Sequence, residues 1–331
     1  MCTAITYQTR DHYFGRNLDL EFSYHETVTI TPRNFPFHFR KLQPMQHHYA
    51  MIGMATVAEN YPLYYEATNE KGLSIAGLNF PGNAVYNEVD EDLESVDNVM
   101  PFELIPWILG QCADLCDVRK LLKRLNLANL AFSEEYPLAP LHWMISDRTG
   151  SYVLETVQTG MMVYENPVGI LTNNPPFDFQ VTNLCNYLNL SREIPVNRFA
   201  EDLLLNPYSR GMGAMGLPGD LSSVSRFVRA AFVKWNSVLD RSEECSELAS
   251  VGQFFHILGS VEQQRGCVRL GEHEYELTLY SSCCNTDKGI YYYKTYENSQ
   301  ITAVDMRREN LDGERLVLYP LITGQQVRWE N

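Results

Sequence analysis

Cys2 carries the most chemistry of any residue in the sequence, because it directly follows the initiator methionine in Met1-Cys2-Thr3. Cysteine is small enough for Met1 to be trimmed, which would leave a thiol and an α-amine on one terminal residue. The α-amine has an unperturbed pKa of about 7.7–8.0, so it can act as general base while the thiol acts as nucleophile. We predict that Met1 is removed. Since any residue can follow a methionine, an ordinary cysteine also fits this position.

Arg16 and Asp19 are the first candidates to assist such a nucleophile. The run Gly15-Arg16-Asn17-Leu18-Asp19 ends the second predicted strand, which we expect beside the strand that begins at Cys2. A carboxylate there can orient the α-ammonium, and an arginine can favour the thiolate. A solvated turn with a local Arg–Asp pair fits the spacing equally well.

Two asparagines and one arginine interrupt patterns that would otherwise be purely structural. Asn173 precedes Asn174-Pro175-Pro176, and such a break can expose its side-chain amide to an oxyanion, although an ordinary Asn-Pro turn also explains it. Asn79 is a lone amide in an apolar strand, which is equally typical of a strand-end hydrogen bond. Arg226 opens a helix where the dipole disfavours a cation, so it either serves the site or pairs with Asp220.

The elements that must position these residues follow from the spacing of apolar residues. Strands are predicted over residues 3–9, 12–17, 26–31, 49–55, 73–80, 141–146, 151–155, 161–164, 169–172, 275–283, 288–293 and 300–305. Helices are predicted over 100–109, 118–125, 222–239 and 251–258. The third has an apolar stripe that includes Trp235 and Val238, and Ser222 or Ser223 can cap it. Strands at both ends with helices between them predict two sheets between helical layers, folded as one domain.

Composition excludes several classes of protein. The chain of 331 residues has a formal net charge of −15 and no Lys/Arg-rich run, so a nucleic-acid partner is not expected. It has no apolar run long enough for membrane insertion and no leader pattern, so we expect a cytoplasmic protein. Its eight cysteines are expected to be free. Cys112 and Cys116 lack a second pair of ligands, so no metal site is predicted.

Seven motifs occur in an order that resembles the choloylglycine hydrolase family. They are Met1-Cys2-Thr3, Gly15-Arg16-Asn17-Leu18-Asp19, Asn69-Glu70-Lys71-Gly72-Leu73, Gly77-Leu78-Asn79-Phe80-Pro81, Leu171-Thr172-Asn173, Leu217-Pro218-Gly219-Asp220 with Ser225-Arg226-Phe227, and Tyr292-Tyr293-Lys294-Thr295-Tyr296-Glu297-Asn298. The resemblance extends from Cys2 to about Leu311. It implies the N-terminal nucleophile hydrolase fold, an α+β four-layer αββα sandwich, here as a single domain over residues 2–331.

The resemblance also implies the roles of the catalytic residues. Cys2 would be the nucleophile, with its own α-amine as base. Arg16 and Asp19 would tune and orient it, and Arg226 would steady the site electrostatically. Neither a metal nor an organic cofactor is expected.

The two asparagines bear on the substrate. Asn173 would donate its side-chain amide to the oxyanion, and Asn79 would contribute its backbone N–H and contact the substrate. The position of Asn79 tends to be tyrosine in the penicillin-preferring members, so asparagine favours bile salts. The expected reaction is hydrolysis of glycine- or taurine-conjugated bile acids through a thioester. Alternatives are a penicillin V acylase, an acyl-homoserine-lactone acylase, or a non-enzymatic carrier of amphipathic sterol ligands.

An apolar pocket is needed for the sterol. The candidates are Leu18, Leu20, Phe22, Tyr65, Phe132 and Leu138, each of which fits a plain core position as well. Arg210 lies in a glycine-punctuated segment, where its guanidinium suits the sulfonate of a taurine conjugate, although a solvent-facing role also fits. The resemblance further implies a homotetramer.

Overall fold

The computed structural model describes residues 1–91, 96–239 and 246–331, so Cys245 lies outside the described residues. Its first sheet runs in the order β12 (Ile170–Leu171), β1 (Cys2–Gln8), β2 (His12–Leu20), β14 (Tyr275–Asn285), β15 (Ile290–Thr295) and β16 (Thr302–Asp305), and β13 (Val268–Arg269) pairs with β14. All these pairs are antiparallel. The strand that begins at Cys2 therefore lies inside a sheet, with a neighbour on each side.

The second sheet is also antiparallel. It runs in the order β11 (Gly160–Glu165), β10 (Gly150–Val157), β9 (Leu141–Asp147), β6 (Ser74–Asn79), β5 (Tyr61–Asn69), β4 (Met51–Ala58), β3 (Thr27–Thr31) and β17 (Val317–Pro320). A separate parallel pair consists of β7 (Asp97–Val99) and β8 (Leu125–Leu127). Strands β1 and β2 contact β6 across the space between the two large sheets, which therefore pack face to face.

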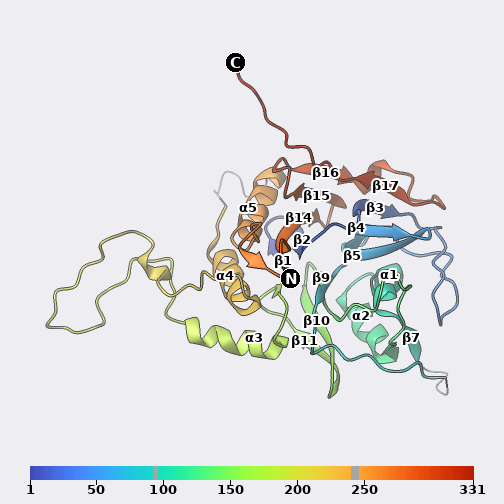
Figure 1. The fold of residues 1–331 in the computed structure, drawn as a ribbon, viewed down its shortest axis with the longest axis horizontal. Coiled ribbons are helices and arrows are strands. Elements are labelled where there is room, and N and C mark those ends of the chain that lie inside the picture. Colours follow the sequence, from blue (N-terminus) through green and yellow to red (C-terminus); the bar gives the residue numbers. More distant parts are fainter. Residues whose placement is uncertain (92–95, 240–245) are drawn as a thin grey trace.

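Helices cover the outer faces of both sheets (Figure 1). α1 (Leu104–Gln111) and α2 (Leu115–Leu121) pack on the second sheet. α4 (Ser223–Asn236) and α5 (Glu247–Gly259) pack on the first, and α3 (Phe177–Leu184) packs on α4. Short 3-10 turns are η1 (Pro101–Glu103), η2 (Leu122–Arg124), η3 (Cys185–Tyr187), η4 (Met212–Ala214) and η5 (Met306–Arg308). The predicted α+β four-layer αββα sandwich is confirmed.

The predicted long helix needs one correction. Ser222 caps α4 by accepting a hydrogen bond from the backbone N–H of Ser225, as expected, but the helix ends at Asn236. Trp235 and Val238, which were predicted on its apolar stripe, are 65% and 70% exposed. The outer face of the last turn of α4 therefore turns to solvent.

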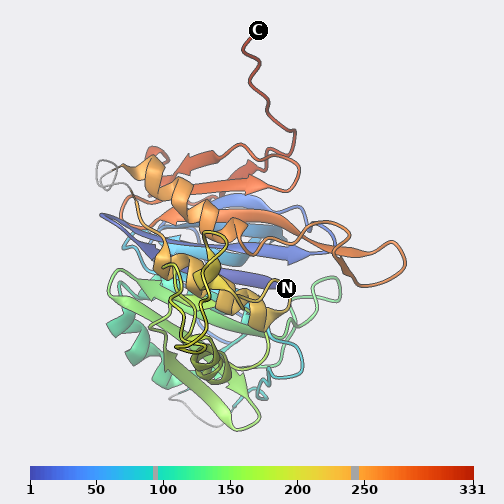
Figure 2. The same cartoon turned by 90° about the vertical axis from the view of Figure 1, so that its left-hand side faces the viewer.

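Two segments leave the body of the molecule. The chain between α3 and α4 loops far outward, and the last residues of the chain extend away from β17 (Figures 1 and 2). We call residues 188–211 the arm. Its large exposed apolar side chains are Leu188, Ile194, Val196, Phe199, Leu203, Leu204, Leu205 and Tyr208. No helix within the described ranges is long and apolar enough to cross a membrane.

Candidate active site

Cys2 lies at the first position of β1, opposite Leu18 of β2, and is 2% exposed. Met1, which precedes Cys2 in the sequence, continues the ladder by one position. The backbone N–H of Asp19 donates to the Met1 carbonyl at 3.0 Å, and the Met1 ammonium donates to the Asp19 carbonyl at 2.7 Å. The same ammonium forms an ion pair with Glu276. Strand pairing thus fixes the backbone around Cys2.

Asp19 lies at the same end of β2, with its carboxyl group fully buried. Its Oδ1 accepts a hydrogen bond from Thr278 Oγ1 at 2.6 Å, and its Oδ2 lies 3.9 Å from Arg226 Nη1. Burial raises the pKa of Asp19, while the positive charges of Arg226 and the N-terminus oppose the rise. The carboxyl is therefore held in place by β14 and α4 rather than by solvent.

Arg16 is also fully buried, three residues before Asp19. Its Nη1 donates to the carbonyls of Gly77 at 2.6 Å and Tyr65 at 3.2 Å, and its Nε lies 3.9 Å from Glu66. Burial lowers the pKa of Arg16, but the neighbouring acidic groups of Cys2, Tyr280 and Glu66 outweigh it and leave the pKa raised. The alternative of a solvated turn with a local Arg–Asp pair is wrong.

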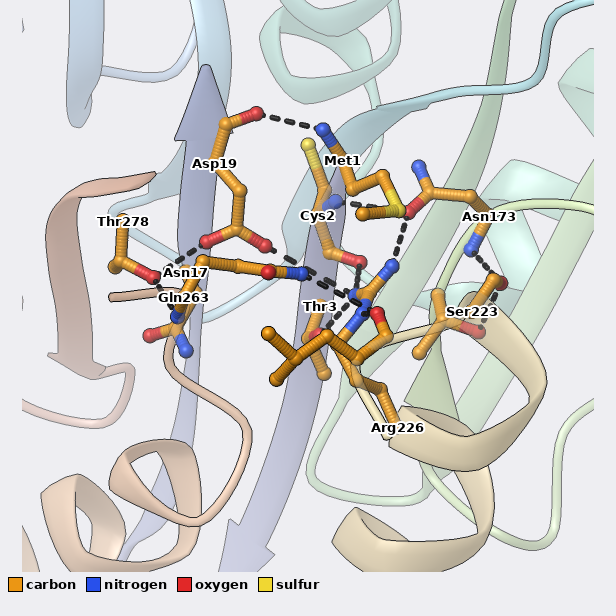
Figure 3. A network of polar contacts seen from close by, with 12 residues as sticks. Met1, Cys2, Thr3, Asn17, Asp19, Asn173, Ser223, Arg226, Gln263 and Thr278 are labelled. Atoms are coloured by element: carbon orange, nitrogen blue, oxygen red, sulfur yellow. Dashed lines mark hydrogen bonds and ion pairs between the residues drawn. The ribbon is translucent and has the colours of Figure 1, made fainter. Parts of the chain in front are cut away.

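Arg226 joins the nucleophile to the oxyanion candidate, as Figure 3 shows. Its Nη1 donates to the Cys2 carbonyl at 2.5 Å and to Thr3 Oγ1 at 2.6 Å, and its Nη2 donates to Asn173 Oδ1 at 2.8 Å. Asp220 does not pair with it, because that carboxylate accepts bonds from the start of α4 instead. Arg226, in the first turn of α4, therefore faces Cys2 and Asn173 rather than Asp220.

Asn173 follows β12, and its side chain faces Cys2. Its Oδ1 accepts from the backbone N–H of Cys2 at 2.8 Å, and its Nδ2 donates to the Asn79 carbonyl at 2.7 Å. An amide nitrogen carries two hydrogens, so one remains for an oxyanion. Its backbone N–H donates to Ser223 Oγ at 2.8 Å, which anchors the segment to α4.

His142 contacts both the segment that carries Asn173 and the segment that carries Asn79, although no pattern in the sequence singles it out. One ring nitrogen lies 2.9 Å from the Thr172 carbonyl, and the other lies 2.9 Å from Glu155 Oε1. The ring stacks on Phe80, with centroids 4.2 Å apart. His142 is fully buried and comes from β9. It therefore holds Thr172 and Phe80, the neighbours of Asn173 and Asn79, in fixed positions.

Cys2, Arg16 and Asn79 open onto a cavity of about 360 Å³. Five of the predicted pocket residues line it: Leu18, Leu20, Tyr65, Phe132 and Leu138. Sequence reasoning missed others, among them Tyr24, Leu63, Phe102, Ile105, Tyr136 and Trp143. Four of these six lie in or next to strands and helices, where an apolar residue gives no sign of facing a cavity rather than the core.

Two predicted substrate-binding residues lie elsewhere. Phe22 does not line the cavity; it is 51% exposed, and its ring packs on Tyr24 with centroids 4.8 Å apart. Its chain has already left β2, which ends at Leu20. Arg210 is exposed on the arm and does not line the cavity of its own chain either.

A larger cavity, of about 860 Å³, lies at the opposite end of β1. Thr6, Gln8 and Lys234 are among its lining residues, and Cys2 is not. Because that lining holds none of the six predicted catalytic residues, the smaller apolar cavity is the candidate active site.

The chain is similar to known hydrolases along nearly its whole length. The family model for linear amide C–N hydrolases of the choloylglycine hydrolase family matches residues 2–319. A bile salt hydrolase/transferase of Lactiplantibacillus plantarum is 57% identical over 326 residues, which are 98% of each chain. A crystal structure of a mutant conjugated bile acid hydrolase from Clostridium perfringens matches with a TM-score of 0.90 and 37% identity over 100% of both chains. Penicillin V acylase from Agrobacterium tumefaciens, at 16% identity and TM-score 0.72 over 95% and 90% of the chains, shares the fold.

Proposed function

The chain belongs to the choloylglycine hydrolase family of linear amide C–N hydrolases, and from this premise we propose that it hydrolyses bile acids conjugated to glycine or taurine. One observation carries the proposal: Cys2 borders an apolar cavity and is surrounded by Arg16, Asp19, Asn173 and Arg226. The names of its relatives, bile salt hydrolase/transferase and conjugated bile acid hydrolase, support the substrate class.

Removal of Met1 is the first requirement of the proposed mechanism, because it turns the Cys2 backbone nitrogen into an α-amine. That amine takes the thiol proton, and the thiolate attacks the amide carbonyl. The free hydrogen of Asn173 Nδ2 and the backbone N–H of Asn79 stabilise the oxyanion. The α-ammonium then protonates the leaving amine, and water hydrolyses the thioester of Cys2.

The charged neighbours have separate tasks in this proposal. Arg16 favours the thiolate by Coulomb attraction. Asp19 orients the α-ammonium. Arg226 holds Cys2 and Asn173 in fixed relative positions through its hydrogen bonds to both. The mature domain comprises residues 2–331.

The sterol occupies the apolar cavity, and its lining residues Leu18, Leu20, Tyr65, Phe132 and Leu138 provide the contacts. Asn79 rather than tyrosine favours bile salts over penicillin V. The sterol pocket and the role of Asn79 both concern the acyl group of the substrate. Competition between a conjugated bile salt and penicillin V therefore tests both.

Assembly and location complete the proposal. We expect a cytoplasmic protein that forms a homotetramer. The exposed apolar side chains of the arm support the assembly. Since Arg210 does not line the cavity of its own chain, it can contact a taurine sulfonate only where the arm reaches the cavity of another copy. Arg210→Ala should then lower turnover of taurine conjugates relative to glycine conjugates; the parent's ratio would contradict this role.

A second activity, acyl transfer to an amine, is also proposed. The 57% identical relative is named a hydrolase/transferase, and a thioester reacts with amines as well as with water. The same Cys2 intermediate would then serve both reactions.

Turnover by the Met1-free protein tests the proposed function. We expect release of cholate from taurocholate and glycocholate, with slower turnover of penicillin V and acyl-homoserine lactones. Binding of cholate without any turnover would instead identify a sterol carrier. Preferred turnover of penicillin V would identify an acylase of the other type.

A further inference from the structure

Met1 marks a position that becomes vacant when it is removed. Its nitrogen and carbonyl oxygen exchange two hydrogen bonds with the backbone of Asp19, at 2.7 and 3.0 Å. Asp19 is fully buried. Trimming therefore leaves one buried backbone donor and one buried acceptor without partners, directly beyond Cys2, and unpaired groups of this kind are costly.

Glu276 faces the same position from β14. Glu276 is 4% exposed, and its carboxylate pairs with the Met1 ammonium. Within residues 1–91, 96–239 and 246–331, its side chain has no other hydrogen bond or ion pair. A buried carboxylate that loses its only partner strongly favours a new cation.

The α-amine of Cys2 is not that cation. The backbone N–H of Cys2 donates to Asn173 Oδ1 at 2.8 Å. The Cys2 nitrogen also lies one residue further along the strand than the Met1 nitrogen, a rise of about 3.3 Å. Asp19 Oδ2, which has no hydrogen-bond partner among the described residues, is available to it as well. Glu276 thus remains for a ligand outside the chain.

We propose that the position vacated by Met1 binds the amino acid that leaves during hydrolysis and that accepts the acyl group during transfer. The ammonium of the amino acid binds Glu276 and the Asp19 carbonyl, as the Met1 ammonium does. Its carboxylate or sulfonate accepts from the Asp19 backbone N–H, as the Met1 carbonyl does. This inference rests on the proposed function and assigns Glu276 a role in amine selection.

Burial and the neighbouring charges both act on the proton of an ammonium at this position. Burial lowers the pKa of the Met1 ammonium, and the charges of Cys2 and Asp19 only partly oppose this. The interaction with Cys2 also places the ammonium within electrostatic reach of the thiol. For an ammonium bound there, burial favours loss of the proton, and the Glu276 carboxylate opposes it.

The transfer step balances without a further reactant. The bound ammonium gives one proton to the neutral α-amine of Cys2, and its nitrogen attacks the thioester carbonyl. The new C–N bond forms as the C–S bond breaks. The second proton of the amine passes to the sulfur, which returns Cys2 as a thiol beside its α-ammonium.

Partition of the thioester between water and glycine tests the proposal. The Met1-free enzyme receives taurocholate as acyl donor and increasing glycine, and glycocholate and cholate are quantified together. In Glu276→Gln, we expect the ratio of glycocholate to cholate at a fixed glycine concentration to fall by about tenfold, since a charge-assisted hydrogen bond is lost. Glu274→Gln, which removes an exposed charge two residues away, is the matched control and should keep the parent's ratio.

Four other results are informative. An unchanged ratio in Glu276→Gln would overturn the proposal. Equal losses of both products with a shifted pH profile would also overturn it, because Glu276 would then act on the α-amine of Cys2. If the parent makes cholate but no glycocholate, inhibition of hydrolysis by glycine decides instead: it should weaken about tenfold in Glu276→Gln. A parent that makes neither product contradicts the proposed function itself.

Discussion

Arg226 is the residue on which the geometry of the site depends most. One guanidinium contacts the Cys2 carbonyl, Thr3 Oγ1 and Asn173 Oδ1, and its Nε donates to the Leu221 carbonyl at 3.0 Å. These partners come from β1, the segment after β12 and the start of α4. A planar group with five donors can join them, whereas a point charge cannot.

Arg226→Lys tests this role. The ammonium keeps the positive charge but cannot reach the Cys2 carbonyl and Asn173 together, so we expect kcat to fall roughly a hundredfold with a much smaller change in KM. Steady-state hydrolysis of taurocholate measures both constants. Arg229→Lys, one turn along α4 and outside the site, is the control. Parent kcat in Arg226→Lys would show that charge alone is needed.

The residues of the site were predictable to the extent that local motifs carry them. Cys2, Arg16 and Asn173 each stand in a distinctive run, and the structure brings them together. Glu66 and Glu276 were missed, because their partners lie far away in the sequence. Glu66 of β5 meets Arg16 of β2 across the space between the two sheets, and Glu276 of β14 meets Met1, which lies 275 residues away. A lone carboxylate in a strand gives no sign of such a partner.

At the scale of elements, β2 determines where the catalytic side chains lie. It carries Arg16 and Asp19 and pairs with both β1 and β14. Gly15 permits the close approach of β14, since a Cβ there would lie 2.1 Å from the Ser282 carbonyl oxygen and 2.9 Å from Cys283 Cα. No rotamer change can relieve contacts with backbone atoms.

Gly15→Ala should therefore destabilise the protein by about 3 kcal/mol, the range expected for overpacking in a core. It should also displace Arg16 and lower kcat. Urea unfolding of the parent and the variant measures the difference. Gly252→Ala in α5, where a Cβ meets nothing within 4 Å, should instead stabilise by up to about 1 kcal/mol. Equal stability of Gly15→Ala and the parent would contradict the packing argument.

Most elements followed from periodicity, and the exceptions have physical reasons. The strand β5 was missed because Glu59 and Asn60 turn the chain with φ of 49° and 61°, without the glycine that usually signals such a hairpin. The strand β17 was missed because it has only four residues, at the edge of the second sheet, which is too short for a clear alternation of apolar and polar residues. Helix α4 ends before Val238 because the backbone of Ser237 is extended.

At the scale of the whole molecule, the arm is the feature that one chain does not explain. Phe199, Leu204 and Tyr208 are 83%, 90% and 83% exposed. Apolar side chains gathered in this way on a projecting segment are typical of an interface. The composition of the arm predicts a loop. It does not predict that this loop projects from the body of the molecule, because that depends on which tertiary contacts the loop makes.

Removal of apolar side chains from the arm tests its role in assembly. The double variant Phe199→Ser and Leu204→Ser should lower the molar mass in solution below that of the parent, for which we propose a tetramer, as measured by light scattering after gel filtration. Glu201→Ser, an exposed change on the same arm, should keep the molar mass of the parent. A tetramer that survives the double variant would place the interface elsewhere.

The most direct test of the central claim is the intact mass of the protein before and after one equivalent of iodoacetamide, with taurocholate turnover measured on the same samples. We predict a mass that lacks Met1, and a label on Cys2 whose extent matches the activity lost. A retained Met1 in an active enzyme would contradict the α-amine as base. Full turnover with Cys2 alkylated would contradict Cys2 as the nucleophile.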